Sequence, residues 1–360
     1  MEAKTDSTCE ACPDDLISNG GSSSTSDCYP APTIFFNLFM TDPKERIFAW
    51  GGSESNQMEA VFEGEPLTSP TSLLFTSPTT FLVSDEDSSK VLKFAYDGTF
   101  LGEFAPGHVH PSPKSMKELS LEGGETLMAV CTSVKVWFFD TQENAVGSID
   151  YPPQTEKARP RDVVAWGEGE VLVAAEWDPE WEGTGRIYKE CLPLEGSACE
   201  GEHVLSVEDG TAPLKLARYS ADSFLLVGTE RLFECGAPVV DGSSEVRMVE
   251  EACRDFAQDP EPENEAWRPT AIAVDEQREL VLVSEATRFK IYAFDFLGNL
   301  IHEIDTPTTA SAMAIKDGVY ERERSALPRS PSANSVFVLA QVLAAVEAVA
   351  PLRHDHDQLH

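Results

Sequence analysis

The sequence is poor in basic residues and has no long apolar run, and each absence excludes a class of protein. Lysine and arginine number 27 against 62 aspartate and glutamate residues, for a net charge of −35. A surface this acidic repels phosphate backbones, so we expect no nucleic-acid partner. No run of about 18 or more uninterrupted apolar residues is present, so we expect no membrane span. The acidity is compatible with cations, with basic protein partners, or with simple solvation.

Three further signals are missing or scarce. The start of the chain, residues 1–6, has no apolar stretch behind it, so no signal peptide is visible. None of the 8 cysteines forms a CxxC…CxxC pair, which argues against a four-thiolate zinc site. Long helical patterns are scarce. The scattered 23 glycines and 24 prolines instead favour many short strands joined by tight turns.

An internal repeat is the strongest feature that is present. Segments 81–85 and 90–94 recur as 281–285 and 290–294, and Gly98 recurs as Gly298 at the same offset. Each copy alternates apolar and polar residues in four short runs bounded by Gly, Asp and Pro, which is typical of antiparallel strands. Four strands in about 40 residues cannot bury both faces alone, and radial stacking of such sheets solves this problem. The repeat therefore predicts an all-β fold, a β-propeller.

The number of blades follows from the weaker copies and from the two ends of the repeat region. Weaker copies at 126–149, 160–206 and 213–249 bring the total to five blades between about 68 and 305. The ends supply half a blade each, and closure of the ring from both termini would leave no unpaired edge. The third and fourth strands of this closing blade are predicted at 46–50 and 58–62, and the first and second at 311–315 and 335–339. We therefore predict six four-stranded blades.

A seven-bladed ring remains the structural alternative. Segment 33–40 also has the pattern of a strand, and it would compete with 335–339 for a place in the closing blade.

The pattern Pro-x-x-Ile-Ala, Val-Ser-Asp/Glu, Lys-Val/Ile, Phe, Gly in 69–105 and 268–305 resembles the NHL repeat. The resemblance is good in these two blades and thin in the three between them. It implies a binding platform for proteins or nucleic acids. A minority of related six-bladed folds are enzymes, namely the gluconolactonase and strictosidine-synthase-like hydrolases and a zinc-dependent amidating lyase.

The first residues resemble the cysteine-rich module of ephrin-type receptors, which usually reads CxxCPxGxxSxxGSxxCxxC. Cys9, Cys12 and Cys28 follow this spacing, whereas Asp15 replaces a glycine and Ala31 stands where a closing cysteine is expected. Such modules depend on disulfides because they have almost no core. The resemblance makes Cys12 and Cys28 disulfide candidates, and it implies a truncated module within a longer extracellular protein.

These features divide the chain into three predicted parts. Residues 1–31 form a cysteine-rich stub that is partly disordered, and residues 32–340 form the propeller. Residues 341–360 form a helical or disordered tail. The alanine-rich run in this tail is either a capping helix or the product of a misread splice junction.

Four later cysteines form two pairs, each within one predicted blade. Cys191 and Cys199 make one pair, and Cys235 and Cys253 make the other. In an oxidising compartment both pairs are predicted to be disulfides, each stabilising by about 2–4 kcal/mol. Cys131 ends a predicted strand, and we expect it to be a buried thiol.

The best candidate for a contact site is an aromatic and acidic insertion in the third full blade. It consists of Trp177, Asp178, Glu180 and Trp181. Loops on rigid scaffolds often carry recognition, and tryptophan is a favoured anchor. Packing of the two indoles against each other is an equally good interpretation.

Candidate metal ligands are few. His108 and His110 lie in a loop between two blades, where two imidazoles could reach one ion, but an ordinary surface loop is the favoured interpretation. Asp85 and Glu285 follow equivalent second strands, where we expect them to bond local backbone and fix turns.

The sequence therefore predicts a non-catalytic extracellular binding or adhesion module for a protein or glycan ligand. The alternative is a calcium-dependent hydrolase of the gluconolactonase and strictosidine-synthase-like class, with calcium as cofactor. That class needs oxygen ligands on the inner strands, where apolar Leu73, Val163 and Ile272 dominate instead. An intracellular scaffold with reduced cysteines stays open because no signal peptide is visible.

Overall fold

The computed structural model describes most of the chain between residues 37 and 316 and two short segments before it. The described residues are 16–17, 29–30, 37–42, 44–50, 58–77, 79–108, 110–121, 124–151, 158–167, 169–177, 185–193, 201–207, 215–228, 230–236, 247–261 and 267–316. The chain divides into two compact units, Met1–Val319 and Tyr320–His360, and the second lies outside the described residues. The tail expected at 341–360 therefore stays a prediction.

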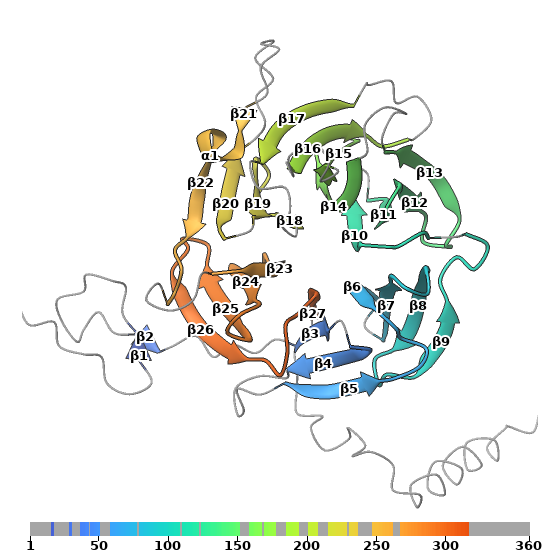
Figure 1. Cartoon of the computed structure of the whole chain (residues 1–360), viewed down its shortest axis with the longest axis horizontal. Coiled ribbons are helices and arrows are strands. Elements are labelled where there is room, and N and C mark those ends of the chain that lie inside the picture. The colour runs from blue at the N-terminus through green and yellow to red at the C-terminus, as the bar shows by residue number, and fades with distance from the viewer. Residues whose placement is uncertain are drawn as a thin grey trace, which may run out of the picture. The chain divides into compact units, whose positions relative to one another are not determined.

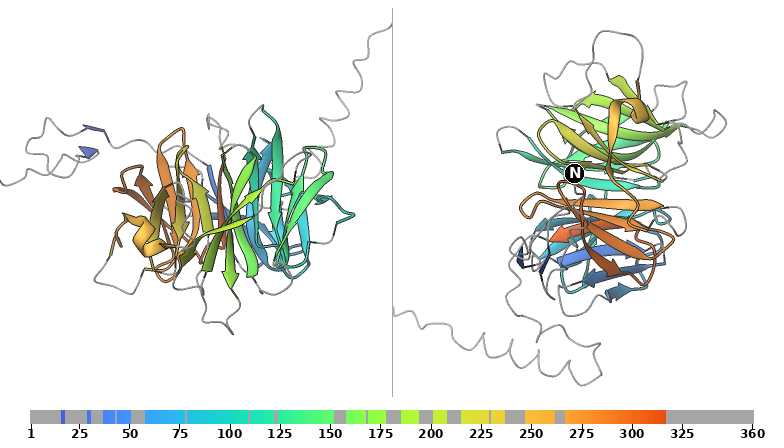
Figure 2. Two further views of the ribbon diagram at one scale, coloured as in Figure 1. Left: turned by 90° about the horizontal axis from the view of Figure 1, so that it is seen from above. Right: turned by 90° about the vertical axis from the view of Figure 1, so that its left-hand side faces the viewer.

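Six sheets, each with four antiparallel strands and one of them extended by a short fifth strand, stand around a central axis, so the predicted all-β, six-bladed propeller is confirmed (Figure 1). The side views show the strands crossing the thickness of the ring (Figure 2). Blade 1 contains β6 Pro70–Ser77, β7 Thr80–Asp85, β8 Lys90–Ala95 and β9 Phe100–Glu103. Blade 2 contains β10 Ser115–Ser120, β11 Thr126–Cys131, β12 Lys135–Phe139 and β13 Ala145–Asp150. Blade 3 contains β14 Ala158–Trp166, β15 Glu170–Trp177, β16 Gly185–Cys191 and β17 Glu202–Val207.

The remaining three blades complete the ring. Blade 4 contains β18 Lys215–Arg218, β19 Ser223–Val227, β20 Leu232–Gly236 and β22 Cys253–Ala257. Blade 5 contains β23 Pro269–Asp275, β24 Leu280–Glu285, β25 Lys290–Asp295 and β26 Leu300–Asp305. Blade 6 contains β27 Ala312–Lys316, β3 Asn37–Asp42, β4 Arg46–Trp50 and β5 Glu59–Glu63. In each blade the first strand in this order lies innermost (Figure 1).

Blade 6 closes the ring, but its second strand differs from the prediction. The inner strand β27 pairs antiparallel with β3, with Ala314 opposite Phe39. The second position of the blade, predicted for 335–339, is therefore occupied by β3, which belongs to the segment 33–40 that also has the pattern of a strand. Blade 6 takes three strands from the N-terminal side of the repeat region and one from the C-terminal side. The ring therefore has six blades, and the seven-bladed alternative is wrong.

Two other strand predictions need correction. The inner strand of blade 2, β10, is absent from the strands that the sequence predicts. The fourth strand of blade 4 was expected to end near residue 249, but it is β22, which pairs with β20 further along the chain. The segment β21 Arg247–Met248 instead pairs in parallel with β17 and extends the edge of blade 3. It leads into α1 Val249–Ala252, a single short helical turn.

The apolar faces of the blades are buried against one another, which is the reason the repeat needs a ring. Phe39 and Ile47 of blade 6 pack with Phe81 and Phe94 of blade 1 in one buried cluster. Similar clusters join blades 2 and 3, blades 3 and 4, blades 4 and 5, blades 5 and 6, and blades 1 and 2. Each blade thus covers the face that its neighbour cannot bury alone.

Hydroxyl groups at the start of the inner strands link successive blades. The Thr71 hydroxyl donates to the Pro113 carbonyl at 2.6 Å, and the Thr270 hydroxyl donates to the Ala310 carbonyl at 3.0 Å. Ser311 of blade 6 donates in the same way to Pro70 at 2.9 Å. Because these bonds join the beginnings of inner strands, those strands start at the same end of the central channel.

The N-terminal region contributes one small described element. β1 Leu16–Ile17 and β2 Tyr29–Pro30 form a two-stranded antiparallel sheet. The cysteines on which the resemblance to the ephrin-type module depends lie outside the described residues, so that resemblance stays a prediction. In the part of the chain that the structure describes, no helix is long and apolar enough to cross a membrane.

Candidate functional site

The central channel contains a cavity of about 310 Å³ lined by all six inner strands. Its lining includes Leu73 and Ile272, two of the apolar residues expected on the inner strands. The third, Val163, is fully buried in the cluster between blades 2 and 3. The cavity lies within the size range of sites for small molecules, and its lining includes both charged and apolar side chains.

Asp162 on β14 is the centre of a buried polar cluster at the end of the channel where the inner strands begin. Its side chain is 1% exposed. The Leu216 amide donates to its Oδ2 at 2.8 Å, and the Val163 amide donates to its Oδ1 at 3.0 Å. The Ser115 hydroxyl also donates to Oδ1. The carboxylate therefore ties β14 to the inner strands on both sides of it.

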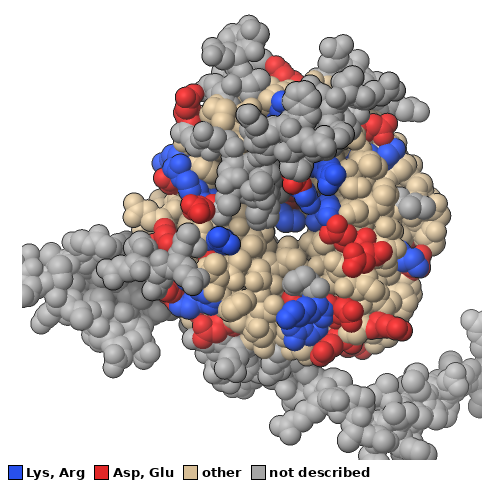
Figure 3. Space-filling model, viewed as in Figure 1, with Lys and Arg blue, Asp and Glu red and all other residues tan. Residues whose placement is uncertain are grey.

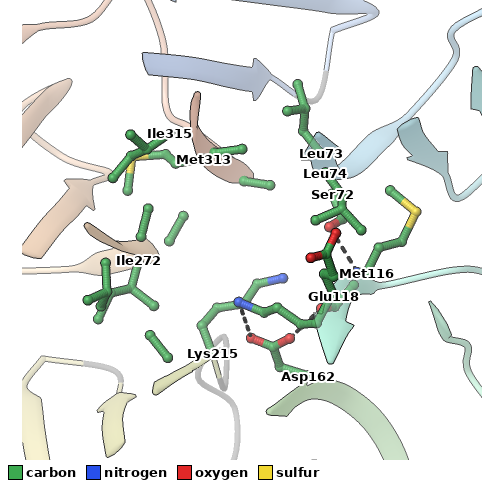
Figure 4. A pocket seen from close by; sticks show the side chains of 18 of the residues that line it. Ser72, Leu73, Leu74, Met116, Glu118, Asp162, Lys215, Ile272, Met313 and Ile315 are labelled. Carbon is green, nitrogen blue, oxygen red and sulfur yellow. Dashed lines mark hydrogen bonds and ion pairs between the residues drawn. The ribbon is translucent and has the colours of Figure 1, made fainter. Parts of the chain in front are cut away.

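Two lysines flank this carboxylate. The ammonium group of Lys117 lies 3.7 Å from Oδ2 of Asp162 and donates to the Leu216 carbonyl at 3.1 Å. The ammonium group of Lys215 donates to the Lys114 carbonyl at 3.3 Å. Figure 4 shows Lys215 and Asp162 next to each other on one side of the cavity.

Burial lowers the pKa of the Lys215 ammonium group, while attraction to Asp162 opposes this effect and repulsion by Lys117 reinforces it. Nearby, Cys131 is a buried free thiol, as the sequence predicted. Burial raises the pKa of this thiol well above its ordinary value, and the Asp162 carboxylate adds to the effect. The thiol is therefore protonated and unreactive at neutral pH.

The cations just outside the cavity are matched by acids. Lys114 forms an ion pair with Glu86, and Arg161 forms one with Glu176. Lys117 and Lys215, in contrast, share the single carboxylate of Asp162. In the space-filling view, basic side chains gather at the edge of the central opening on the side of β14 and β18, and acidic side chains lie close to its right-hand edge (Figure 3). Lys215 is a cation of the cavity lining for which no ion pair is formed within the described residues.

The other charged residues of the lining come later in their strands or after them. They are Glu118 on β10, Arg218 on β18 and Glu276 after β23. Glu118 and Glu276 are exposed, and Arg218 donates to the Ser220 carbonyl at 3.3 Å. Glu118 directly follows Lys117 on β10, but neither Glu118 nor Glu276 forms an ion pair with Lys117 or Lys215.

The two histidines of the predicted metal pair lie close to the same aromatic ring. His108 and His110 have ring centroids 5.4 and 5.6 Å from that of Phe139. His110 is 1% exposed, so the interpretation as an ordinary surface loop is wrong for this residue. Within the described residues, no group of three His, Cys, Asp or Glu side chains could hold a metal ion. The metal site stays a prediction.

The predicted contact loop lies largely outside the described residues. Trp177 is the last residue of β15, but its side chain is not described, and Asp178, Glu180 and Trp181 lie beyond the described part. Their role in ligand binding stays a prediction.

One of the predicted disulfides is confirmed. Cys235 and Cys253 are bonded and join β20 to its partner β22. Cys191 also forms a disulfide, but Cys199 lies outside the described residues, so that pairing stays a prediction. Cys12 and Cys28 lie outside them too.

The acids after the second strands have the structural role that the sequence predicted. The Asp85 carboxylate accepts from the Thr68, Ser69 and Ser88 amides at 2.6, 2.9 and 2.9 Å. Burial alone would raise the pKa of Asp85, but these bonds hold it below its ordinary value. Glu285 of blade 5 accepts from the amides of Arg268 and Arg288 in the same position of the repeat.

The cluster around Lys117, Asp162 and Lys215 was missed from the sequence. Each residue looks like an ordinary polar position in a short strand. A signal was nevertheless present, because each lies on an inner strand of a repeat, and the inner strands converge on the axis of a propeller.

Comparison with known proteins supports the fold. No family model matches the sequence, and neither does any curated protein. Among solved structures, a chain of a nidogen/laminin complex is similar with a TM-score of 0.54 and 10% identity, over 78% of this chain and 98% of that one. A protein of unknown function from Bacteroides caccae has a TM-score of 0.50 and 11% identity, over 79% of this chain and 100% of that one. Such low identity shows the propeller fold and no function.

Proposed function

We propose that this chain is a non-catalytic extracellular binding module that binds a protein or glycan ligand on the surface of its propeller. The observation that carries the proposal is the state of Asp162. This buried carboxylate of the channel is bonded to three protein donors and flanked by an ammonium group. Its oxygens accept hydrogen bonds that link β14 to the inner strands on both sides.

The alternative, a calcium-dependent hydrolase, needs a different arrangement in the channel. Calcium takes six to eight oxygen ligands, usually with several carboxylates. Here, binding an ion at Asp162 would break its bonds to two neighbouring inner strands and would place the ion beside Lys117. Glu118 and Glu276, the other acids of the lining, are exposed. This arrangement favours binding over metal-assisted hydrolysis.

Two observations support an extracellular protein-binding role. The Cys235–Cys253 disulfide is typical of proteins that fold in an oxidising compartment. A chain of similar fold belongs to a nidogen/laminin complex, so that chain takes part in a protein assembly. Both fit the resemblance of the N-terminal cysteines to a module of extracellular proteins.

The first experiment tests catalysis directly. Calorimetric titration with calcium, together with a panel of lactones and esters, is expected to show neither ion binding in the channel nor turnover. Calcium binding that is lost in Asp162→Asn, together with calcium-dependent hydrolysis, would overturn the proposal in favour of the hydrolase.

The second experiment tests binding. The purified protein is offered to a glycan array and to immobilised laminin, and a Trp177→Ala/Trp181→Ala variant is compared with Leu300→Ala as a control. Leu300 is an exposed apolar residue on the outer strand of blade 5. We expect saturable binding to one class of probe, lost in the tryptophan variant and retained in the control. Absence of binding to either class would contradict the proposed function.

A further inference from the structure

Two lysines and one buried carboxylate meet in the channel on the side of β10, β14 and β18. Lys117 and Lys215 bring two ammonium groups to one buried carboxylate, that of Asp162. The nearby cations Lys114 and Arg161 have acidic partners of their own. Among the described residues, no second acid forms an ion pair with the two lysines, so the Lys215 ammonium group has no ion pair of its own, although Glu118 lines the same cavity.

This arrangement of two lysines destabilises the folded protein unless an anion binds between them. A lysine that leaves water loses hydration, and a second cation next to it adds repulsion. Both effects act on Lys215, and its hydrogen bond to a backbone carbonyl uses only part of the donor capacity of its ammonium group. An anion in the channel would relieve both the loss of hydration and the repulsion.

The opposite wall of the same cavity is apolar. Leu73 of β6, Ile272 of β23 and Met313 of β27 line it, and each is less than a tenth exposed. Figure 4 shows Met313 across the cavity from Asp162, with Leu73 and Ile272 to either side. A ligand that fills the cavity would therefore meet cations on one side and hydrocarbon on the other.

We propose that the channel binds a small organic carboxylate with an apolar body. Its carboxylate lies between the ammonium groups of Lys117 and Lys215, where charge-assisted hydrogen bonds are strong. Its apolar part packs against Leu73, Ile272 and Met313. The cavity of about 310 Å³ limits the ligand to a small molecule. This internal site is separate from the outer surface proposed for a protein or glycan, and either can fail without the other.

The test is a calorimetric titration with hexanoate and benzoate, and with hexanamide as a neutral match for hexanoate. We expect both carboxylates to bind with one site per chain and hexanamide to bind at least about tenfold more weakly, because it cannot pair with the lysines. Hexanamide binding as tightly as hexanoate, or no measurable binding of either carboxylate, would overturn the proposal.

Variants locate the site. Lys117→Gln and Lys215→Gln are each expected to weaken hexanoate binding at least about tenfold, since each removes one charged hydrogen-bond donor. Arg218→Gln is the matched control, because Arg218 lines the same cavity on the same strand as Lys215 but towards the other end. Loss of affinity in Arg218→Gln, with both lysine variants unchanged, would contradict the position of the carboxylate. Thermal unfolding of each variant shows that it is folded, and either lysine variant suffices if the other does not fold.

Discussion

At the scale of single residues, His110 is a titratable group that folding removes from water. It is 1% exposed, and neither of its ring nitrogens has a hydrogen-bond partner among the described residues. Burial lowers its pKa from 6.5 to about 4, and the neighbouring His108 adds to the effect. The ring is therefore neutral in the folded protein at pH 7.

This environment predicts a pH dependence of stability. Between pH 6.5 and about pH 4 the unfolded chain binds a proton at His110 and the folded chain does not, so the free energy of unfolding falls as the pH falls through this window. A shift of this size corresponds to about 3 kcal/mol. Urea unfolding at pH 7 and pH 4.5 should therefore show a smaller loss of stability on acidification in His110→Leu than in the wild type.

The exposed Leu300 on β26 provides a control for this experiment, because its side chain carries no titratable group. We expect Leu300→Ala to lose stability on acidification as much as the wild type does. If His110→Leu follows the wild type as closely, His110 is not buried as described.

Residue roles were predictable where they depend on local sequence. Asp85 and Glu285 bond amides within a few residues of their own turn and of the strand before it, so the repeat alone located their function. Lys117 and Lys215 were not recognised as site residues, because their role depends on which inner strands lie next to each other around the axis. The burial of His110 depends on its packing against Phe139 of the blade that follows it, which no local pattern reveals.

At the scale of elements, neighbouring blades approach each other closely at the turns between third and fourth strands. Gly98 and Gly298 occupy equivalent turns with φ of 86° and 81°. A Cβ on Gly298 would lie 2.1 Å from the carbonyl oxygen of Phe256 in the outer strand of blade 4, and one on Gly98 would lie 2.8 Å from that of Val61 in blade 6. Both the left-handed backbone and the close approach require glycine.

Gly298→Ala is therefore expected to destabilise the protein more than an alanine at an open left-handed turn. Gly64 is the matched control, since its φ is 95° and a Cβ at this position would have nothing within 4 Å. Gly64→Ala should cost about 1–2 kcal/mol from backbone strain. Gly298→Ala should cost about 1–3 kcal/mol more, because the methyl group collides with the neighbouring blade. Equal costs in urea unfolding would show that the two blades do not approach here.

The Cys235–Cys253 disulfide stabilises blade 4 across its outer pair of strands. The bonded cysteines are 18 residues apart and lie opposite each other in β20 and β22. Closure of a loop of this length predicts a contribution of about 3 kcal/mol. Cys235→Ser/Cys253→Ser should lower the free energy of unfolding by this amount, and reductant should lower it further only through other disulfides. A double variant as stable as the wild type would contradict the assignment.

The elements could be predicted wherever alternation was clear, as in the two strongest copies of the repeat. The inner strand β10 was missed because Lys117, Glu118 and Ser120 interrupt its apolar residues. The polar residues of this channel-lining strand thus obscure the alternation by which a strand is recognised in the sequence. The fourth strand of blade 4 was misplaced because the chain first makes β21 at the edge of blade 3, a pairing set by tertiary contact.

At the scale of the whole molecule, the ring depends on one strand that is distant in sequence from its partners. β27 supplies the inner edge of a blade whose other three strands are β3, β4 and β5. The sequence predicted closure from both ends, but it favoured the wrong second strand because 33–40 and 335–339 have equally good patterns. Periodicity identifies a strand, whereas only the geometry of closure decides which one is used.

Removal of β27 should therefore open the ring. A chain that stops after Ala310 loses this strand, while a chain that stops after Val319 keeps it and is the control. We expect the shorter chain to lose more than about 5 kcal/mol, since the loss exposes the buried cluster around Met313 and the edge of β3. Similar urea midpoints for the two chains would mean that β27 does not close the ring.

Hydrogen–deuterium exchange of the full chain tests this closure most directly. Because β27 pairs with β3 and lines the channel, peptides covering Ala312–Lys316 should exchange as slowly as those covering β23 in blade 5. Exchange of Ala312–Lys316 within seconds, while β23 stays protected, would show that the strand is unpaired and that the ring is not closed as described.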